Sequence, residues 1–174
     1  MASATLHRRV MHAPSDLVDL VSDVERYPEF INLLSAVRIS NRETFSEDVE
    51  TFEAEANVSF KFVSDTFRSI VKVDRANHTI DVAKANRSGA VKSLKNNWVF
   101  HPLSDGSTLV DFFVEVKLKA FPLEMMMRDK FDKAGQHIMG LFEVKAGQIY
   151  EKVGDADLDL NAELKRLGLG QVKV

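Results

Sequence analysis

The chain has 174 residues, 45% of them apolar and 28% charged, which is enough to bury one hydrophobic core without covalent cross-links. Because cysteine is absent, disulfides, thiolate metal sites and a cysteine nucleophile are excluded. The formal net charge of −3 argues against a general nucleic-acid binder, so we expect no DNA partner.

The first segment of the chain predicts a strand followed by a helix. Residues 4–11 predict the strand, although Arg8 interrupts its apolar face. Pro14 then suits the first turn of a helix, because its ring fixes a helical φ and no partner is needed for its missing N–H. Apolar residues recur at helical spacing after Pro14 and predict one buried face. They are Leu17, Leu20, Val21 and Val24.

The stretch "SDVERYPEFI" places two aromatic residues and a proline directly after that helix. Pro28 disfavours helical geometry at Tyr27, so the first helix should end before Tyr27, and a second short turn should carry Phe30 and Ile31. Two interpretations stay open. The segment is either a hydrophobic plug that closes a small domain or a movable flap over a cavity.

Between residues 35 and 118 apolar residues recur at every second position, which predicts an antiparallel meander. In residues 49–58 the apolar face alternates with a polar face that carries Glu53 and Glu55, which we expect to be solvated. The pair Asp105–Gly106 is a strong hairpin signal between the last two strands. The expected strands are 36–39, 49–58, 67–73, 79–85, 93–100 and 108–118.

A long helical pattern covers residues 122–153. Gly135, Gly140 and Gly147 lie in its interior, and each costs about 1 kcal/mol relative to alanine. Either close approach of a strand or room for a bound molecule would account for them. Lys145 lies near the apolar stripe, and we expect its stem to snorkel near the helix end. The stripe comprises Leu123, Met127, Phe131, Ala134, Ile138, Leu141, Phe142 and Ile149.

The composition changes after Gly154, so we divide the chain into a domain of residues 1–153 and a tail of residues 154–174. Leu160, Leu164 and Leu167 are spaced to line a weak amphipathic turn within the tail. Disorder of the tail and docking of the tail on a partner are both open alternatives.

The chain carries no recognisable catalytic motif. It contains no nucleophile elbow, no Walker loop and no dinucleotide-binding glycine motif, and its histidines lack a helical metal-ligand spacing. We therefore expect a non-enzymatic protein with no metal and no catalytic cofactor. A small-molecule cyclase or hydrolase is an alternative, with Lys145, Asn96 and His137 as remote candidates. The histidines are His7, His12, His78, His101 and His137.

Twelve phenylalanines accompany two tyrosines and one tryptophan, so the interior should be apolar and poor in polar groups. Each aromatic residue on its own is explained by core packing. Together they also suit the wall of a cavity between a curved sheet and one long helix. The candidates are Phe52, Phe60, Phe62, Phe67, Trp98, Phe100, Phe112, Phe131 and Phe142.

This order of elements resembles the α+β helix-grip, or START-like, fold of the polyketide cyclase and lipid-transfer superfamily. That fold has a curved antiparallel sheet of about seven strands wrapped on a long C-terminal helix, with two short helices after the first strand. The segments "DLVSDVERYPEF", "VKSLKNNWVF" and "LFEVKAGQIY" resemble the coenzyme Q-binding protein family, whose bacterial members are also named ribosome-association toxins. The resemblance covers residues 5–153. Ala13 and Val91 depart from it, where relatives usually carry a serine and a phenylalanine.

The resemblance implies a hydrophobic tunnel that binds a polyprenyl quinone, ubiquinone or a precursor, and delivers it to respiratory or biosynthetic complexes. Tyr27, Pro28 and Phe30 would form part of its mouth. A ribosome-binding inhibitor of subunit association is the alternative that the family also implies. The residues implied to bind the ligand are Tyr27, Pro28, Phe30, Phe52, Ala54, Ala56, Phe60, Trp98, Phe100, Phe112, Phe131, Ile138 and Phe142.

A quinone carrier must touch a membrane to load, so we expect apolar residues at its mouth with cationic residues nearby. The sequence shows no secretory signal and no run of about 18 apolar residues. We therefore expect a cytoplasmic protein peripheral to the bacterial inner membrane, or a mitochondrial equivalent. The apolar candidates are Phe30, Ile31 and Leu33, and the cationic ones are Arg26, Arg38 and Arg128.

Overall fold

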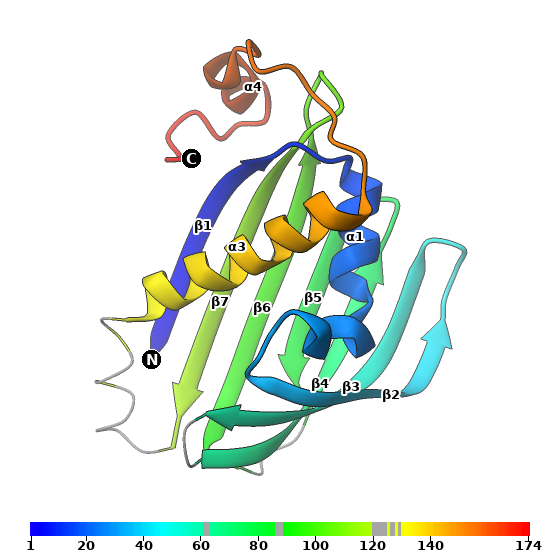
Figure 1. Ribbon diagram of the computed structural model, residues 1–174, viewed down its shortest axis with the longest axis vertical. Coiled ribbons are helices and arrows are strands. Elements are labelled where there is room, and N and C mark those ends of the chain that lie inside the picture. The colour runs from blue at the N-terminus through cyan, green and yellow to red at the C-terminus, as the bar shows by residue number, and fades with distance from the viewer. Residues whose placement is uncertain (61–62, 86–88, 120–124, 126–127, 129) are drawn as a thin grey trace.

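One seven-stranded antiparallel sheet organises the protein in the computed structural model (Figure 1). The structure describes residues 1–60, 63–85, 89–119, 125, 128 and 130–174. The strand order is β1-β7-β6-β5-β4-β3-β2. Strands β2 to β7 form a meander, and β1 pairs with β7 as the edge strand. The strands are β1 (Ala2–Val10), β2 (Leu34–Thr44), β3 (Val49–Phe60), β4 (Val63–Asp74), β5 (Thr79–Lys84), β6 (Val91–Pro102) and β7 (Thr108–Leu118).

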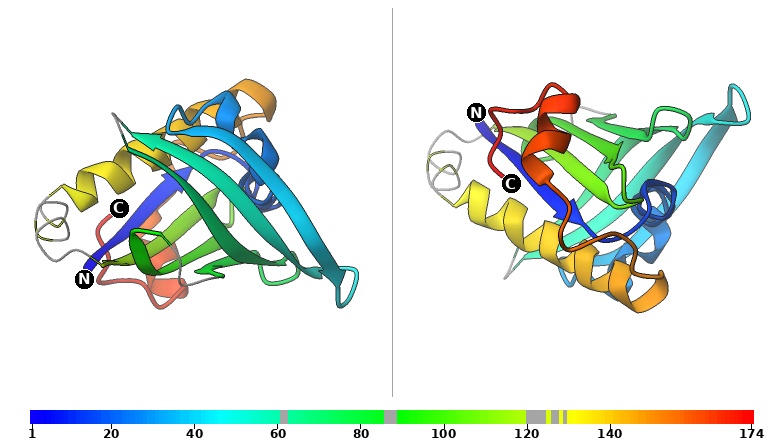
Figure 2. Two further views of the ribbon diagram at one scale, coloured as in Figure 1. Left: turned by 90° about the horizontal axis from the view of Figure 1, so that it is seen from below. Right: turned by 90° about the horizontal axis from the view of Figure 1, so that it is seen from above.

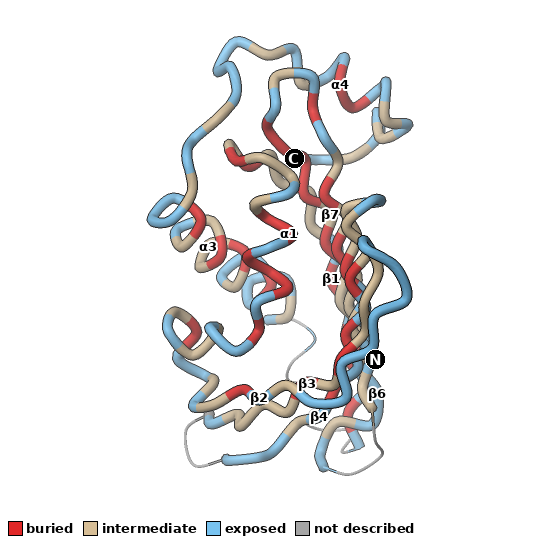
Figure 3. Tube along the Cα trace, turned by 90° about the vertical axis from the view of Figure 1, so that its right-hand side faces the viewer, coloured by how far each residue is buried: buried red, intermediate tan, exposed pale blue. Residues whose placement is uncertain are grey.

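The main helices lie on one side of this sheet. The sheet curves, and α3 (Phe131–Ile149) runs along its concave side, with α1 (Pro14–Ser22) and the 3₁₀ helix η1 (Val24–Glu29) beside it (Figures 2 and 3). A short helix, α4 (Leu160–Arg166), follows near the C-terminus. Among the described residues, no helix combines the length and apolar character needed to cross a bilayer. This arrangement confirms the predicted helix-grip fold.

The period-two pattern correctly predicted the strands and their faces. Phe52 and Ala54 of β3 are 1% and 5% exposed, whereas Glu53 and Glu55 lie on the outer face. There Arg68 donates a hydrogen bond to Glu55 at 2.6 Å, and Asn41 donates one to Glu53 at 2.8 Å, so both carboxylates have partners at the surface. The β6–β7 hairpin turns at Gly106, whose φ of 87° favours glycine.

Helix α1 begins at Pro14, as predicted, and its N-cap residue Ala13 makes no side-chain cap. The second short helix begins earlier than expected, because 3₁₀ geometry carries the chain from Val24 through Pro28. Phe30 and Ile31 therefore follow η1 instead of forming a turn of their own. Their backbone N–H groups both donate to the carbonyl of Tyr27, at 3.1 and 2.8 Å.

Helix α3 ends at Ile149, so the prediction that it continues to residue 153 was wrong. Beyond Tyr150 the chain is extended, because its polar groups bond to the segment after β1 instead of to the helix. His12 Nδ1 lies 2.9 Å from the carbonyl of Glu151, and Val153 N–H donates to Met11 O at 2.9 Å. Most of the predicted helical residues before 131, including Leu123 and Met127, lie outside the described residues.

The buried face of α3 is also narrower than the predicted stripe, since Ile149 is 41% exposed. At Gly135 an added Cβ would lie 3.2 Å from Leu6 Cδ1 of β1, so close approach of a strand explains this glycine. At Gly140 and Gly147 an added Cβ would meet nothing within 4 Å, and neither of the two proposed reasons applies. The residues of α3 that are buried are Gly135, Met139, Phe142 and Ala146.

The C-terminal segment folds back on the chain itself, an outcome that the sequence analysis did not consider. Leu164 of α4 is 5% exposed and packs with Leu103 and Leu109 at the β6–β7 hairpin. The carboxylate of Glu163 accepts hydrogen bonds from the N–H and hydroxyl of Ser104. A second small core and a buried carboxylate therefore hold α4 on the hairpin.

Candidate functional site

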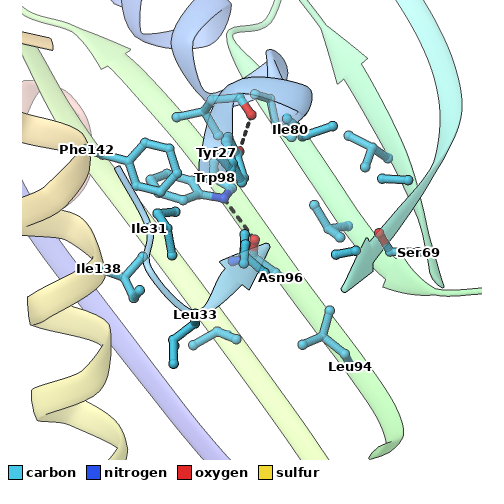
Figure 4. A pocket seen from close by; sticks show the side chains of 18 of the residues that line it. Tyr27, Ile31, Leu33, Ser69, Ile80, Leu94, Asn96, Trp98, Ile138 and Phe142 are labelled. Atoms are coloured by element: carbon cyan, nitrogen blue, oxygen red, sulfur yellow. Dashed lines mark hydrogen bonds between the residues drawn. The ribbon is translucent and has the colours of Figure 1, made fainter. Parts of the chain in front are cut away.

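A cavity of about 410 Å³ lies between the concave face of the sheet, α3 and the η1–β2 connection (Figure 4). This volume is in the lower part of the range of roughly 300–1,000 Å³ that small-molecule pockets span. Among the described residues no charged side chain lines it, and nearly all lining side chains are apolar. The sheet and its long helix therefore leave an apolar hollow between them.

Most of the residues predicted to contact a ligand meet at this cavity. They come from η1, β3, β6, β7 and α3, because the inward-facing positions of adjacent strands lie side by side and α3 presents the same face to them. Those that line the cavity are Tyr27, Ala54, Ala56, Trp98, Phe112, Phe131, Ile138 and Phe142.

Four predicted residues do not line the cavity. Phe52 and Phe100 are each 1% exposed and fill the core. Phe30 packs against the rings of Tyr27 and Phe142, and neither Phe30 nor the preceding Pro28 lines the cavity. The side chain of a fifth predicted residue, Phe60, lies outside the described part of the chain.

An aromatic cluster closes the cavity where η1 meets α3. The ring of Phe142 is edge-on to Tyr27 and Phe30, with centroids 5.1 and 5.2 Å apart, and such pairs contribute about 0.5–1.5 kcal/mol each. The hydroxyl of Tyr27 donates to the carbonyl of Val21. Burial, followed by the charge of Asp23, raises the pKa of Tyr27 above its ordinary value, so the phenol stays neutral. This geometry favours a plug at Tyr27 over an opening there.

An ion pair fastens the same segment to α3. The ammonium group of Lys145 lies 3.3 Å from Glu29 Oε2 and 5.9 Å from the centroid of the Phe30 ring. Hydrogen bonds from Arg26 and then from Lys145 lower the pKa of Glu29. Lys145 is thus a snorkelling residue near the helix end, as predicted, and its side chain does not line the cavity.

The cavity meets solvent at its other end, between the start of β2 and the first turns of α3. Leu33 is 39% exposed and Ala134 is also exposed, yet both line the cavity. Leu33 was predicted at the mouth, whereas Ile31 is 5% exposed and faces the interior. Among the described residues, exposed Leu33 and Ala134 therefore mark the mouth of the cavity, whereas packing of Phe30 against Phe142 fills the space beside Tyr27.

Polar groups on the cavity wall are few and mostly paired. The indole N–H of Trp98 donates to Asn96 Oδ1 at 2.8 Å, and Asn96 Nδ2 donates to the carbonyl of Phe113 at 2.8 Å. Ser69 also lines the wall and is 7% exposed. Ser69 was not among the predicted site residues, although a serine on the apolar face of strand 67–73 is a signal that could have identified it.

The arrangement offers little for acid–base or metal chemistry. Within the described ranges, no three histidine, aspartate or glutamate side chains are grouped as metal ligands. Of the remote catalytic candidates only Asn96 reaches the cavity, and His137 is exposed on α3. The chemistry that the wall supports best is burial of an apolar molecule with one or two polar atoms.

Comparisons with known proteins agree with this geometry. The family described as polyketide cyclase / dehydrase and lipid transport matches residues 10–139. The ribosome association toxin RatA of Rickettsia prowazekii is 30% identical over 82% of this chain and 95% of its own length. An 18 kDa protein of Caulobacter crescentus, solved in solution, is 31% identical, with a TM-score of 0.70 over 86% of this chain and 98% of that one. A START superfamily protein of Mycobacterium smegmatis is 18% identical, with a TM-score of 0.71 over 86% and 99%. The chain therefore belongs to the polyketide cyclase / dehydrase and lipid transport family and has its START-like fold.

Proposed function

We propose that this protein binds a polyprenyl quinone, ubiquinone or a precursor, and delivers it without catalysing a reaction on it. The observation that carries the proposal is the apolar cavity of about 410 Å³ with an open end at Leu33 and Ala134. The family description includes lipid transport, and the D-V-x-x-Y-P-x-F element at residues 23–30 resembles coenzyme Q-binding proteins.

The energetics of such a site suit a carrier. Moving one five-carbon isoprene unit out of water gains on the order of 3 to 4 kcal/mol, at about 0.8 kcal/mol for each carbon. A quinone tail already rests in lipid, so its transfer from a bilayer into an apolar cavity exchanges similar surroundings. The ligand can therefore leave as readily as it enters.

The size of the cavity limits how much of the ligand it encloses. A volume of 410 Å³ suits a ring and the first part of a tail, because drug-sized molecules occupy pockets of roughly 300–1,000 Å³. The rest of a long tail would leave through the mouth. We accordingly propose that the end of the molecule around Leu33 contacts the membrane transiently during loading and delivery.

A vesicle transfer assay tests this proposal. Donor vesicles carry a prenyl quinone, acceptor vesicles carry none, and the rate of quinone appearance in acceptors is measured with and without the delipidated protein. The proposal predicts that the rate rises in proportion to protein concentration. A rate that stays at the level of spontaneous exchange would refute it.

A second candidate function is inhibition of ribosomal subunit association. It is favoured by the name of the Rickettsia prowazekii relative, which matches this chain over 95% of its length. The net charge of −3 is unfavourable for contact with ribosomal RNA. Sedimentation of ribosomes in a sucrose gradient distinguishes the two. An increase in free subunits on adding the protein would support this candidate, and unchanged profiles would dismiss it.

A further inference from the structure

Two polar side chains interrupt the apolar wall of the cavity, at positions one inward-facing step apart along the strands. Asn96 of β6 and Ser69 of β4 both line the cavity, and both lie on strands whose other inward-facing residues are apolar or aromatic. A polar group in such surroundings costs free energy unless it finds a partner. The partners that these two side chains have within the protein therefore decide how much capacity is left for a ligand.

Asn96 has one established partner for each end of its amide. Its oxygen accepts from Trp98 and its nitrogen donates to the carbonyl of Phe113. An amide has two donor N–H groups and an oxygen with two lone pairs, so each end keeps one further bond to offer. The bonds to Trp98 and Phe113 together use half of this hydrogen-bonding capacity.

The hydroxyl of Ser69 has fewer hydrogen-bond partners than the amide of Asn96. It makes no hydrogen bond to any other described residue, although the residue is only 7% exposed. A hydroxyl that is turned towards an apolar cavity can donate one hydrogen bond and accept two. Ser69 is thus able to bind a carbonyl or hydroxyl oxygen of a molecule inside the cavity.

The register of the sheet places Asn96 and Ser69 apart. Asn96 pairs with Val82 of β5, Val82 pairs with Val71 of β4, and Ser69 lies one inward-facing position further along β4. Two strand spacings, about 10 Å across the sheet, and one inward-facing step of about 7 Å along β4 together put the two Cα atoms about 12 Å apart. A single carbonyl does not bridge that distance, whereas a ring with oxygens at opposite ends does.

The order of the inward-facing residues along β6 sets the direction in which a ligand lies in the cavity. Along β6 the inward-facing residues run from Leu94 through Asn96 to Trp98, and Trp98 contacts Phe142 at the closed end. Figure 4 shows Asn96 between Trp98 and Leu33. A ligand oxygen at Asn96 therefore lies deep, and a tail attached to the same ring has its exit at Leu33 and Ala134.

We infer that the cavity holds a para-quinone ring head-first, with one carbonyl oxygen on Asn96, the other on Ser69, and the tail leaving past Leu33. This inference rests on the proposed function and adds the orientation of the ligand and the two residues that select its head group. Either redox state of the ring fits, since both side chains can donate and accept.

The only tryptophan of the chain, Trp98, provides the test. A quinone with two isoprene units is titrated into the delipidated full chain while Trp98 fluorescence is followed, and displacement of an apolar dye measures binding separately. The same displacement is run with an isoprenoid hydrocarbon that has no oxygen. Ser69→Ala removes one hydroxyl, and Ser64→Ala on the exposed part of the same strand is the matched control.

The head-first orientation predicts strong quenching of Trp98 that saturates at one quinone per chain. It also predicts that Ser69→Ala binds the quinone about 3- to 10-fold more weakly, from the loss of one neutral hydrogen bond, and binds the hydrocarbon unchanged. The infrared carbonyl band of the bound quinone should move to higher frequency in Ser69→Ala. Ser64→Ala should match the unsubstituted protein in all three measurements.

Two results would overturn the inference, and they are distinguishable. If the quinone displaces the dye but leaves Trp98 fluorescence and the Ser69→Ala affinity unchanged, the ring does not lie at Asn96 and Ser69, while the proposed function stands. If the quinone does not displace the dye at all, the proposed function fails and the orientation fails with it.

Discussion

Replacing Ala54 with leucine would fill part of the cavity from its wall. Ala54 is 5% exposed, lies on β3 and lines the cavity directly. The leucine side chain would project into space that no protein atom occupies, so its burial requires little rearrangement of the core. The variant should therefore be more stable than the unsubstituted protein when no ligand is bound, and it should bind ligand poorly.

The size of the effect follows from the added carbon atoms. Burying three more carbons gains about 2.4 kcal/mol, at about 0.8 kcal/mol each, and ordering a leucine side chain costs about 0.5–1 kcal/mol. The net gain is about 1.5–2 kcal/mol. For a chain of this length that raises Tm by about 3–8 °C. The lost volume should weaken binding of a prenyl quinone by at least about tenfold.

Calorimetry of the delipidated protein measures the first effect, and dye displacement measures the second. Ala83→Leu is the matched control, because Ala83 lies on the exposed face of β5, where the same substitution should change stability by less than about 0.5 kcal/mol. A lower Tm for Ala54→Leu would mean that the space is already filled. Unchanged quinone binding in Ala54→Leu would mean that the ligand lies elsewhere.

Three further predictions concern the frame around the cavity. Phe142→Ala removes the ring that contacts both η1 and Trp98, and urea denaturation should show a loss of about 3–5 kcal/mol; a loss below about 1 kcal/mol would contradict the packing. Burial alone would raise the pKa of Asp105, but hydrogen bonds from Ser107, Asp155 N–H and Arg9 hold that pKa well below its ordinary value. The ionised Asp105 therefore stabilises the fold fully above the unfolded pKa of about 3.9, and this stabilisation is lost as the pH falls through the lower pKa of the folded state. The difference in unfolding free energy between the unsubstituted protein and Asp105→Asn should narrow on acidification. A difference that stays constant with pH would refute this. Gly140→Ala should stabilise the protein by about 0.5–1 kcal/mol, because nothing lies within 4 Å of the added Cβ. Gly154→Ala should destabilise it by more than about 1 kcal/mol, because Gly154 has a φ of 110° and an added Cβ would lie 2.9 Å from Met11 Cε. Equal effects of the two substitutions on Tm would contradict both predictions.

Local patterns in the sequence were sufficient to predict the frame of the fold. Alternation of apolar and polar residues gave the strands and their inward faces, because a strand turns successive side chains to opposite sides. The turn at Asp105–Gly106 and the helix start at Pro14 depend on backbone preferences of those residues alone. The spacing of Leu160, Leu164 and Leu167 likewise indicated the amphipathic turn that α4 forms.

Features that depend on distant contacts could not be predicted in this way. After α3 ends at Ile149, the N–H of Val153 donates to the carbonyl of Met11. Helix α4 is held by the bond between Glu163 and Ser104, residues that are 59 positions apart. The closed end at Tyr27 results from packing against Phe142 of a different helix. No periodic pattern carries information about such pairings.

The residues of the candidate site likewise fall into those that local patterns predict and those that depend on distant contacts. Inward-facing residues such as Trp98 and Phe112 follow from strand alternation and were predicted to lie on the wall. Phe52 and Phe100 share that alternation but pack in the core without lining the cavity, and alternation alone does not distinguish the two outcomes. The ligand contact proposed for Ser69 depends on the position of Ser69 relative to Asn96, and the register of three strands sets that position.

Native mass spectrometry of the gently purified protein can detect the ligand itself, because it reports the bound molecule and its stoichiometry together. If the cavity is a quinone site, the spectrum should show a species heavier than the polypeptide by one prenyl quinone per chain, and Ala54→Leu should lose that added mass. Detection of the bare polypeptide alone, from cells whose membranes contain the quinone, would contradict the claim that the cavity is a quinone site.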